Sequence, residues 1–178
     1  MFGGDGNDIL TFDASDLIMD GGNGVDTLNL SGNVDFSGLD QISNLEQLSM
    51  AGNGTADTLS VTFEELFDLV GDNSLEAFVP ENDHKVIVIN GDTEDALIIE
   101  GSDVRTQTPI QTGIDLYGDG NSYALFQDAT LGLDVYVLST LLEAEPEPGS
   151  EKPTAPVTGL SSLDSYLHEP TLDAFGGF

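Results

Sequence analysis

A nonapeptide near the start of the chain occurs twice, and its spacing constrains the fold more than any other feature of the sequence. Residues 3–11 (GGDGNDILT) and 21–29 (GGNGVDTLN) share the pattern G-G-x-G-x-D-x-U-x, in which U is apolar, and they begin 18 residues apart. Between them lies a degenerate unit, residues 12–20 (FDASDLIMD), which lacks the glycines but keeps an apolar eighth residue, Met19. The apolar series Leu10, Met19, Leu28 predicts short strands that turn one side chain inward every nine residues.

The two glycine-rich turns predict a cation site. Glycine permits the positive φ angles of tight turns, which leaves backbone carbonyl groups directed at one point. The sixth residue adds a carboxylate, and calcium takes roughly six to eight oxygen ligands. We therefore expect calcium ligands from both turns: Gly3, Gly4, Asp5, Gly6, Asp8, Gly21, Gly22, Asn23, Gly24 and Asp26. The alternative is a pair of Gly/Asp-rich loops that bind no metal.

The charge balance excludes some classes of protein. The chain has 33 Asp and Glu against three Lys and Arg, for a formal charge of −30. A nucleic-acid-binding protein needs basic residues against phosphate, so that class is excluded, and docking on anionic lipid is disfavoured. Repulsion among so many carboxylates predicts a chain that is expanded without calcium and compact with it.

The sequence shows no cysteine, no membrane-spanning run and no cleavable signal peptide. With no cysteine, the chain forms no disulfide, so calcium is the available cross-link if the protein is extracellular. No apolar run approaches the ~18 residues that span a bilayer, so we expect no membrane insertion. Residues 1–4 show no cleavable signal peptide.

The repeat weakens after residue 38. Residues 30–38 keep Asp35 in the sixth place but put Ser37 in the apolar place, and residues 39–47 put Glu46 there. We therefore expect the strict repeats to end near residue 38. Residues 41–50 predict a strand. Residues 51–59 (AGNGTADTL) resemble a nonapeptide stretched by one residue, which leaves open either a further calcium site or a plain turn.

One helix is predicted after this region. Thr62 with Glu65 three residues later is a capping box, and Val61 with Leu66 occupies the hydrophobic-staple positions. The residues Phe63, Leu66, Phe67 and Val70 lie on one helical face, and Gly71 would end the helix. A helix of this kind would cover the open end of a stack of strands.

Several strands are predicted between residues 85 and 138. Residues 85–89 and 96–99 are apolar on both faces, so at least one is fully buried. The loop between them is a hairpin or a corner, and its acidic residues Asp92, Glu94 and Asp95 leave open a weak calcium site or an ordinary turn. Residues 102–112 predict an exposed connection. Residues 114–117, 123–126 and 135–138 predict an antiparallel meander.

The last part of the chain differs in composition. Residues 143–158 are acidic and proline-rich, which predicts an extended linker without a core. Residues 159–178 regain apolar side chains, but the short helix expected over residues 162–168 is too short to be stable alone.

These features together resemble the C-terminal region of large RTX adhesins and related RTX exoproteins, whose calcium-binding repeat is the nonapeptide found here. The resemblance covers residues 3–142 and is strongest in the nonapeptides. It implies an all-β fold: a calcium-binding parallel β-roll (1–38), which continues into a β-solenoid-like and meander domain with one capping helix (39–142). A linker (143–158) and a disordered tail (159–178) would follow.

The same resemblance implies a function. RTX exoproteins leave Gram-negative cells through a type I secretion channel that recognises an uncleaved C-terminal signal, and residues 159–178 look like such a signal. We therefore expect a secreted or cell-surface, non-enzymatic module that binds Ca²⁺, folds after export and caps an exoprotein. In the RTX β-roll, alternate nonapeptides stack, so the turn at Gly3 would lie over the turn at Gly21 with calcium between them.

Two alternatives remain open. The chain could be an adhesin module that binds a cell-surface ligand, or the C-terminal tail of an RTX protease or lipase with catalysis upstream. The sequence itself contains no G-x-S-x-G or H-E-x-x-H motif. Of its two histidines, His84 lies in a polar stretch that predicts a solvated side chain, and His168 lies in the tail.

Overall fold

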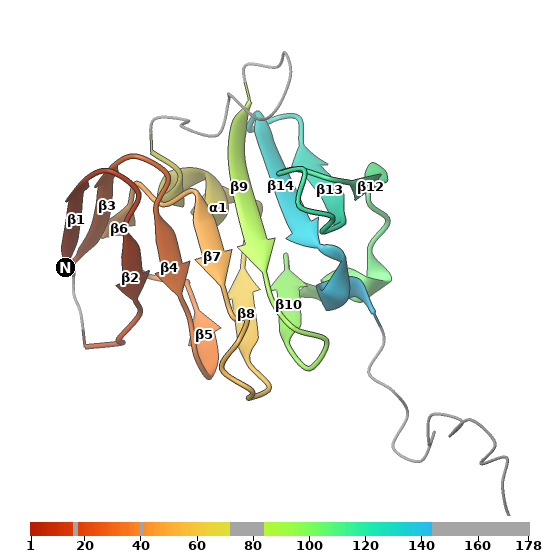
Figure 1. Cartoon of the computed structure of the whole chain (residues 1–178), viewed down its shortest axis with the longest axis horizontal. Helices are drawn as coiled ribbons and strands as arrows, with labels where there is room; N and C mark the ends of the chain where they lie inside the picture. Colours follow the sequence, from red (N-terminus) through yellow and green to blue (C-terminus); the bar gives the residue numbers. More distant parts are fainter. Residues whose placement is uncertain (16–17, 40, 72–83, 144–178) are drawn as a thin grey trace, which may run out of the picture. The chain divides into compact units, whose positions relative to one another are not determined.

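The computed structural model describes residues 1–15, 18–39, 41–71 and 84–143, which are mostly β-sheet with one α-helix (Figure 1). The chain divides into two units, Met1–Glu145 and Pro146–Phe178. The second unit lies outside the described residues, and so do His168 and the expected tail. In the described part of the chain, no helix has the length and apolar character needed to cross a membrane.

The strands form three sheets. The three-stranded sheet has the order β1 (Phe2–Asp5), β3 (Met19–Asn23), β6 (Ile42–Ser43). The four-stranded sheet has the order β11 (Ser102–Asp103), β10 (Ala96–Ile99), β8 (Thr58–Val61), β5 (Asn33–Asp35). The seven-stranded sheet has the order β12 (Gln111–Ile114), β13 (Tyr123–Asp128), β14 (Leu133–Leu138), β9 (Lys85–Asn90), β7 (Gln47–Ser49), β4 (Thr27–Asn29), β2 (Ile9–Thr11). The described residues also contain two short 3-10 helices, η2 (Val104–Thr106) and η3 (Ser139–Leu142).

The chain passes from sheet to sheet, so most neighbours within a sheet are parallel strands from different parts of the sequence. In the seven-stranded sheet, Leu10 pairs with Leu28, Leu28 with Leu48, and Leu48 with Ile89. All four are buried. Met19, by contrast, lies in the three-stranded sheet opposite Ile42 and is also fully buried. The expected inward-facing series Leu10, Met19, Leu28 and the all-β class are confirmed.

One hydrophobic core fills the space between the sheets. Its buried side chains extend from Leu10 to Leu141 without a break at residue 38, and α1 (Phe63–Leu69) adds Leu66 and Leu69 to it. Complete burial of a leucine side chain stabilises a fold by about 1.5–3 kcal/mol. The glycine-rich turns are therefore held by the same core as the strands that follow.

A second, smaller core covers the outer face of β9 and β14. It contains Val86, Val88 and Tyr136, packed against Leu116 and Tyr123. This packing explains why β9 is apolar on both faces. Residues 86–89 are all buried, as expected for at least one of the two apolar strands, and Lys85 is half-buried. Burial raises the pKa of the neighbouring Tyr117 to about 12.

The helix begins as its sequence predicts but ends differently. The Thr62 Oγ1 accepts a hydrogen bond from Glu65 N at 3.1 Å, and the Glu65 carboxylate accepts one from Thr62 N at 2.7 Å, so the capping box is confirmed. Val70, with an extended backbone, is the C-cap, and Gly71 follows it directly but lacks the positive φ of a closing glycine. Lys85 Nζ instead binds the carbonyl oxygens of Phe67 and Val70 at 3.1 and 2.9 Å.

The structure corrects two expected segments and decides between the alternatives for a third. Residues 41–50 form two strands, β6 and β7, with a corner at Asn44, whose φ is 55°. Residues 102–112 are more than an exposed connection, because they contain β11, η2 and the start of β12, and Val104 is fully buried. The loop over residues 90–95 is a corner, because β9 and β10 lie in different sheets. The meander is present as the antiparallel strands β12, β13 and β14, but its first strand is Gln111–Ile114 and not residues 114–117 as expected.

Candidate calcium site

The two glycine-rich turns lie one above the other. In the parallel pair β1–β3, Gly4 is opposite Gly22 and Asp5 is opposite Asn23, as the 18-residue spacing requires. Gly6 N donates a hydrogen bond to Asn23 O at 2.7 Å, and Val25 N donates one to the Asn7 side-chain oxygen at 3.0 Å. The structure thus brings all ten expected ligand residues together on two stacked turns.

The close approach of the turns explains the glycines. Gly22 and Gly24 have φ values of 103° and 141°, which L side chains rarely adopt. A Cβ added at Gly22 would lie 2.1 Å from the carbonyl oxygen of Gly4, and one added at Gly24 would lie 2.3 Å from that of Gly6. Any side chain here would therefore push the turns apart and cover the carbonyl groups between them.

The carboxylates of the two motif aspartates, Asp8 and Asp26, lie on the inner side of these turns. Asp8 N donates a hydrogen bond to Asp26 Oδ1 at 2.7 Å, so the second aspartate contacts the backbone of the first. Asp26 is fully buried. The Oδ2 atoms of both aspartates are buried and have no hydrogen-bond partner. A buried carboxylate oxygen without a partner costs roughly 1–3 kcal/mol or more, so these two atoms fit a site that a cation completes.

Each Oδ2 atom lies beside the first glycine of its own turn. A Cβ added at Gly3 would come within 3.0 Å of Asp8 Oδ2, and one added at Gly21 within 2.7 Å of Asp26 Oδ2. Backbone and carboxylate oxygens are the hard ligands that calcium prefers. Among the described residues, no three acidic or histidine side chains cluster as a metal site, so a cation here would depend on backbone carbonyls.

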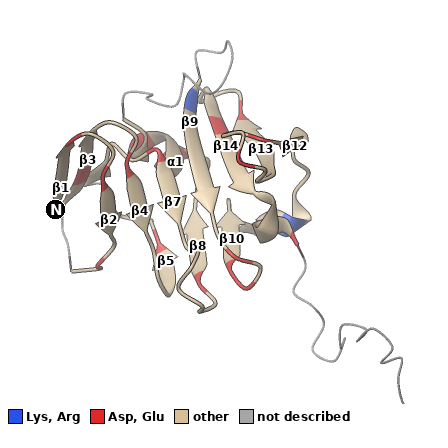
Figure 2. Ribbon diagram, in the orientation of Figure 1, with Lys and Arg blue, Asp and Glu red and all other residues tan. Residues whose placement is uncertain are grey.

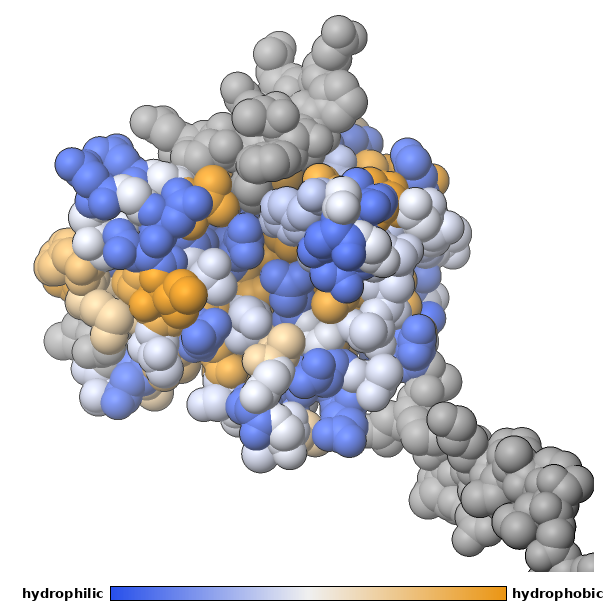
Figure 3. Space-filling model, viewed as in Figure 1, coloured by the Kyte–Doolittle hydropathy of each residue, from blue (hydrophilic) through white to orange (hydrophobic). Residues whose placement is uncertain are grey.

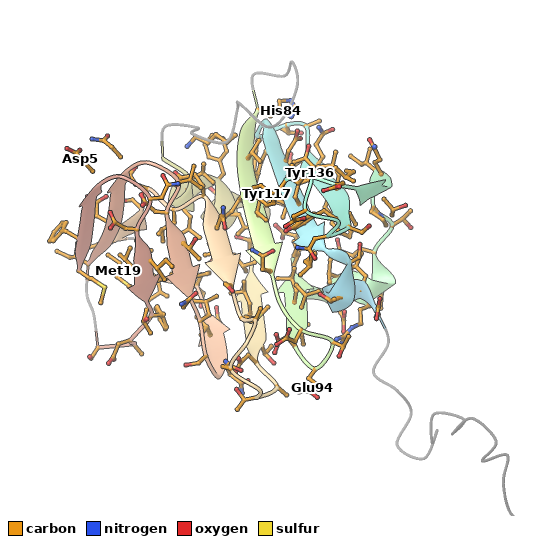
Figure 4. All side chains as sticks on the ribbon, viewed as in Figure 1. Asp5, Met19, His84, Glu94, Tyr117 and Tyr136 are labelled. Carbon is orange, nitrogen blue, oxygen red and sulfur yellow. The ribbon has the colours of Figure 1, made fainter. Side chains whose placement is uncertain are left out.

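The remaining side chains of the turns contact one another. Asn23 Nδ2 donates a hydrogen bond to Asp5 Oδ1 at 2.9 Å, on the exposed side of the turns. Figure 4 shows Asp5 at the outer side of the first turn. The Asp5 and Asn23 side chains therefore tie the turns together from outside, whereas the Asp8 and Asp26 carboxylates face inward.

A third acidic residue, Glu46, lies next to Asp26 on the same inner side, and the sequence pattern did not predict it. Asp26 N donates a hydrogen bond to Glu46 Oε2 at 2.9 Å, and Glu46 is 2% exposed. Burial raises the pKa of Glu46, and the Asp26 charge adds to the rise, although backbone hydrogen bonds partly oppose it. Because Gln47 pairs with Thr27, the register here is 20 residues, not 18. Glu46 therefore occupies the aspartate place and Leu48 the apolar place, which corrects the expectation for residues 39–47.

The third turn nevertheless lacks the carbonyl-lined loop. The chain makes this corner with Asn44 and the fully buried Leu45, in place of the glycines. The Asn44 carbonyl oxygen approaches Gly21 so closely that an added Cβ would lie 1.9 Å from it. The stacked glycine turns are thus confined to residues 3–8 and 21–26.

At the acidic corners on the other side of the fold, the carboxylate oxygens already accept hydrogen bonds from the protein. Asp57 Oδ1 accepts hydrogen bonds from Gly32 N at 2.6 Å and Thr55 Oγ1 at 3.2 Å, and its Oδ2 accepts one from Asn53 Nδ2. Burial raises the pKa of Asp57, but the hydrogen bonds from Asn53, Gly32 and Thr55 outweigh it, so the pKa lies below its usual value. These contacts favour the plain turn over a calcium site at residues 51–59.

The carboxylates of the corner at residues 90–95 also accept hydrogen bonds from the protein. Asp95 Oδ1 accepts a hydrogen bond from Asp57 N at 3.0 Å, and its Oδ2 accepts one from Asp92 N at 2.7 Å. Asp92 Oδ2 in turn accepts one from Gly52 N at 2.9 Å. The ordinary-turn interpretation is favoured here too.

His84 differs from its expected solvated state. Its Nδ1 lies 2.9 Å from Asp134 Oδ1, and Asp134 is 1% exposed. Gln127 Nε2 donates a hydrogen bond to the same oxygen at 2.6 Å. The pairing of residue 84 with residue 134 depends on the parallel contact of β9 with β14, which the local sequence does not reveal.

Comparison with known proteins identifies no relative. No protein-family model matches the chain, and no curated protein or solved structure is significantly similar to it.

Proposed function

We propose that this chain is a calcium-binding module of an RTX-like exoprotein, in which stacked turns of a short parallel β-roll hold Ca²⁺. The observation that carries the proposal is the pair of buried Oδ2 atoms of Asp8 and Asp26, which have no partner in the protein. They face the backbone of two turns whose glycines leave carbonyl oxygens uncovered. Calcium would supply the missing positive charge at this point.

The protein residues divide into two roles in this proposal. Asp8 and Asp26 provide charged oxygens, and the glycines at positions 3, 4, 6, 21, 22 and 24 provide room for carbonyl ligands. Figure 2 shows acidic residues at many of the turns that end the strands and few basic residues on the described ribbon. A cation that binds only the folded chain stabilises it by mass action, by about 2.7 kcal/mol at a hundredfold excess over Kd.

The proposal also covers export of the protein from the cell and its folding outside. In the low calcium of a bacterial cytosol, repulsion among the carboxylates would keep the chain loose enough for a type I secretion channel. Residues 159–178 would serve as its signal, and calcium outside the cell would then fold the non-enzymatic module. Deleting residues 159–178 should abolish export beside a matching exporter while leaving calcium-dependent folding intact. Export that persists without these residues would place the signal elsewhere.

Calorimetric titration with calcium tests the site directly. Asp8→Asn and Asp26→Asn should each weaken the same calcium at least about tenfold, because each removes one charged oxygen. The matched control is Asp13→Asn, which removes the same charge from an exposed carboxylate that accepts hydrogen bonds from Ser15. Equal losses in all three variants would mean that affinity follows total charge, and the proposed site would be wrong.

Circular dichroism tests the link between calcium and folding. A chelator should reduce the strand signal, and calcium but not equimolar magnesium should restore it, because magnesium demands a tighter octahedron. A spectrum that is identical in chelator and in calcium would contradict calcium-dependent folding.

A cleft favours the ligand-binding module as a second candidate function. It has a volume of about 360 Å³ between the end of β5 and α1. Phe36, Leu39 and Ile42 contribute its apolar lining, and Glu65 and Asp68 contribute acidic groups. A glycan or peptide array probed with the calcium-loaded protein would test this candidate, with Ile42→Asp as the variant that should lose binding.

A further inference from the structure

The outer face of the seven-stranded sheet carries a row of uncharged polar side chains. In β2, β4, β7 and β9, which lie side by side (Figure 1), a residue near the end of each strand is buried in the main core. The residue that follows it therefore projects from the outer face. The register places these outward residues next to one another across the sheet. We call them the polar row: Thr11, Asn29, Ser49 and Asn90.

Part of the polar row lines a groove of about 290 Å³. Its members from β2, β4 and β7 contribute to the lining, and so do residues 51–53, which form the corner after β7. Gly52 N donates a hydrogen bond to Asp92 Oδ2 at 2.9 Å, so this corner is tied to the next one. A wall that is held in advance lowers the ordering cost of binding. The groove shares no lining residue with the cleft near α1.

The groove is uncharged although the chain is strongly acidic. β2, β4 and β7 contain no charged residue, and none of the residues that line the groove is charged. The outer face of the four-stranded sheet, by contrast, carries Asp35 beside Ser60. In Figure 3, mainly pale and blue side chains cover β4 and β7. A formal charge of −30 repels anions, and a cation would find no carboxylate in the groove, so its chemistry selects an uncharged polar partner.

The polar groups of the groove are not used by the fold. Among the described residues, the side chains of Thr11, Asn29 and Ser49 have no hydrogen-bond partner in the protein. Thr11 and Asn29 are exposed, and Ser49 is half-buried. Their hydroxyl and amide groups can each donate and accept hydrogen bonds. A sugar hydroxyl also does both, so the groove can match it in either direction.

Two tyrosines lie beside the polar row on the same face. Tyr123 donates a hydrogen bond from its hydroxyl to Asn90 Oδ1 at 3.2 Å, and Gln47 Nε2 donates one to the Tyr117 hydroxyl oxygen at 3.1 Å. The two rings meet edge to face, with centroids 6.0 Å apart, and Tyr117 is half-buried. A tyrosine combines an apolar ring with a polar end, which suits the apolar C–H face and the hydroxyl rim of a sugar ring.

We propose that the polar row and its groove bind an uncharged glycan chain that lies across the strands. Adjacent strands are about 4.8 Å apart, which is close to the length of one pyranose unit in an extended glycan. Each strand therefore presents one hydroxyl or amide side chain to each successive sugar. Because single hydrogen bonds at an exposed surface are weak, affinity should rise with glycan length until the row is covered.

A glycan array tests the proposal with the calcium-loaded full chain. The array carries uncharged hexose and N-acetylhexosamine oligomers of increasing length, beside uronate and sulfated counterparts. The wild type should bind uncharged oligomers, with affinity that rises with length. Nuclear magnetic resonance titration with the best uncharged oligomer should then shift the amides of β2, β4 and β7, where the groove lies.

A pair of double variants assigns the binding to the polar row. Asn29→Ala with Ser49→Ala should raise the Kd for that oligomer at least about tenfold. The matched control is Asn33→Ala with Ser60→Ala, which removes the same two side-chain types from the outer faces of β5 and β8. Asn33 is exposed and Ser60 is half-buried, as Asn29 and Ser49 are, so the two double variants differ only in the sheet that they alter.

Circular dichroism of each protein checks that it is folded, so the result does not depend on whether calcium is needed for folding. A folded wild type that binds no uncharged glycan on the array, or binds charged glycans as well, would overturn the proposal. Binding that survives Asn29→Ala with Ser49→Ala, or an equal loss in the control, would overturn it too, because the glycan would then bind elsewhere.

Discussion

Asp26→Asn should stabilise the protein in chelator, and calcium should reduce or reverse that gain. The asparagine keeps a side-chain oxygen that can accept the hydrogen bond from Asp8 N, which is 2.7 Å long in the wild type. It loses the charge on the buried Oδ2, which has no protein partner. It also removes the repulsion that helps to raise the pKa of Glu46.

The structure gives a magnitude for each condition. In chelator, removing the uncompensated buried charge should raise the free energy of unfolding by roughly 1–3 kcal/mol. In calcium, a tenfold weaker site should lower it by about 1.4 kcal/mol, which offsets or reverses that gain. The measurement is urea denaturation of both proteins in chelator and in saturating calcium, followed by fluorescence of the tyrosines.

One result would refute this reasoning. If Asp26→Asn lowered the free energy of unfolding equally in chelator and in calcium, the Asp26 carboxylate would be a structural hydrogen-bond acceptor and not a cation ligand. Asp57→Asn is the matched control, because Asp57 is also buried but both of its oxygens accept hydrogen bonds. That variant should lose stability by the same amount in both conditions.

Three further variants test other parts of the structure. In chelator, Glu46→Gln should leave the free energy of unfolding unchanged at low pH and raise it near pH 7, because burial raises the pKa of Glu46 above its usual value. The wild type thus loses stability as pH rises through that raised pKa, and a difference between the proteins that does not change with pH would contradict the assignment. Gly22→Ala should lower the free energy of unfolding by more than about 2 kcal/mol in urea denaturation, because its Cβ would clash with the backbone of Gly4. The control Gly52→Ala also has a positive φ but lies in open space, so it should lower the free energy of unfolding by only about 1 kcal/mol. Lys85→Ala should cost about 1–3 kcal/mol in the same assay, because it leaves two carbonyls at the end of α1 without a charged donor; no loss would show that water replaces the ammonium group.

Local patterns predicted local structure well. The capping box of Thr62 and Glu65, the strands over residues 85–90 and 96–99, and the buried series Leu10, Met19, Leu28 all depend on neighbouring residues or on a fixed repeat. The same repeat put all ten expected ligand residues on stacked turns. Each of these features is specified within a short window of sequence.

The errors arose where the period changed or where distant segments met. An unbroken 18-residue spacing puts Glu46 in the apolar place, whereas the corner at Asn44 and Leu45 changes the register to 20. With a two-residue shift in the repeat, Leu48 aligns with Leu28. The contact of His84 with Asp134 and the bonding of Lys85 to α1 link residues far apart, and no local pattern reports them.

The hydrogen bonds from backbone to carboxylate that join one corner to the corner stacked on it run in one direction along the chain. Asp8 N bonds to Asp26 and Asp26 N to Glu46; on the other side, Gly32 N bonds to Asp57 and Asp57 N to Asp95. In every pair the acceptor comes later in the sequence than the donor. The amide of each earlier corner therefore depends on a carboxylate supplied by the corner stacked after it, so local opening of a later corner removes the acceptor of the earlier one. Amide exchange at Asp8 and Gly32, the first donors of the two series, should accordingly be at least as fast as at Asp26 and Asp57.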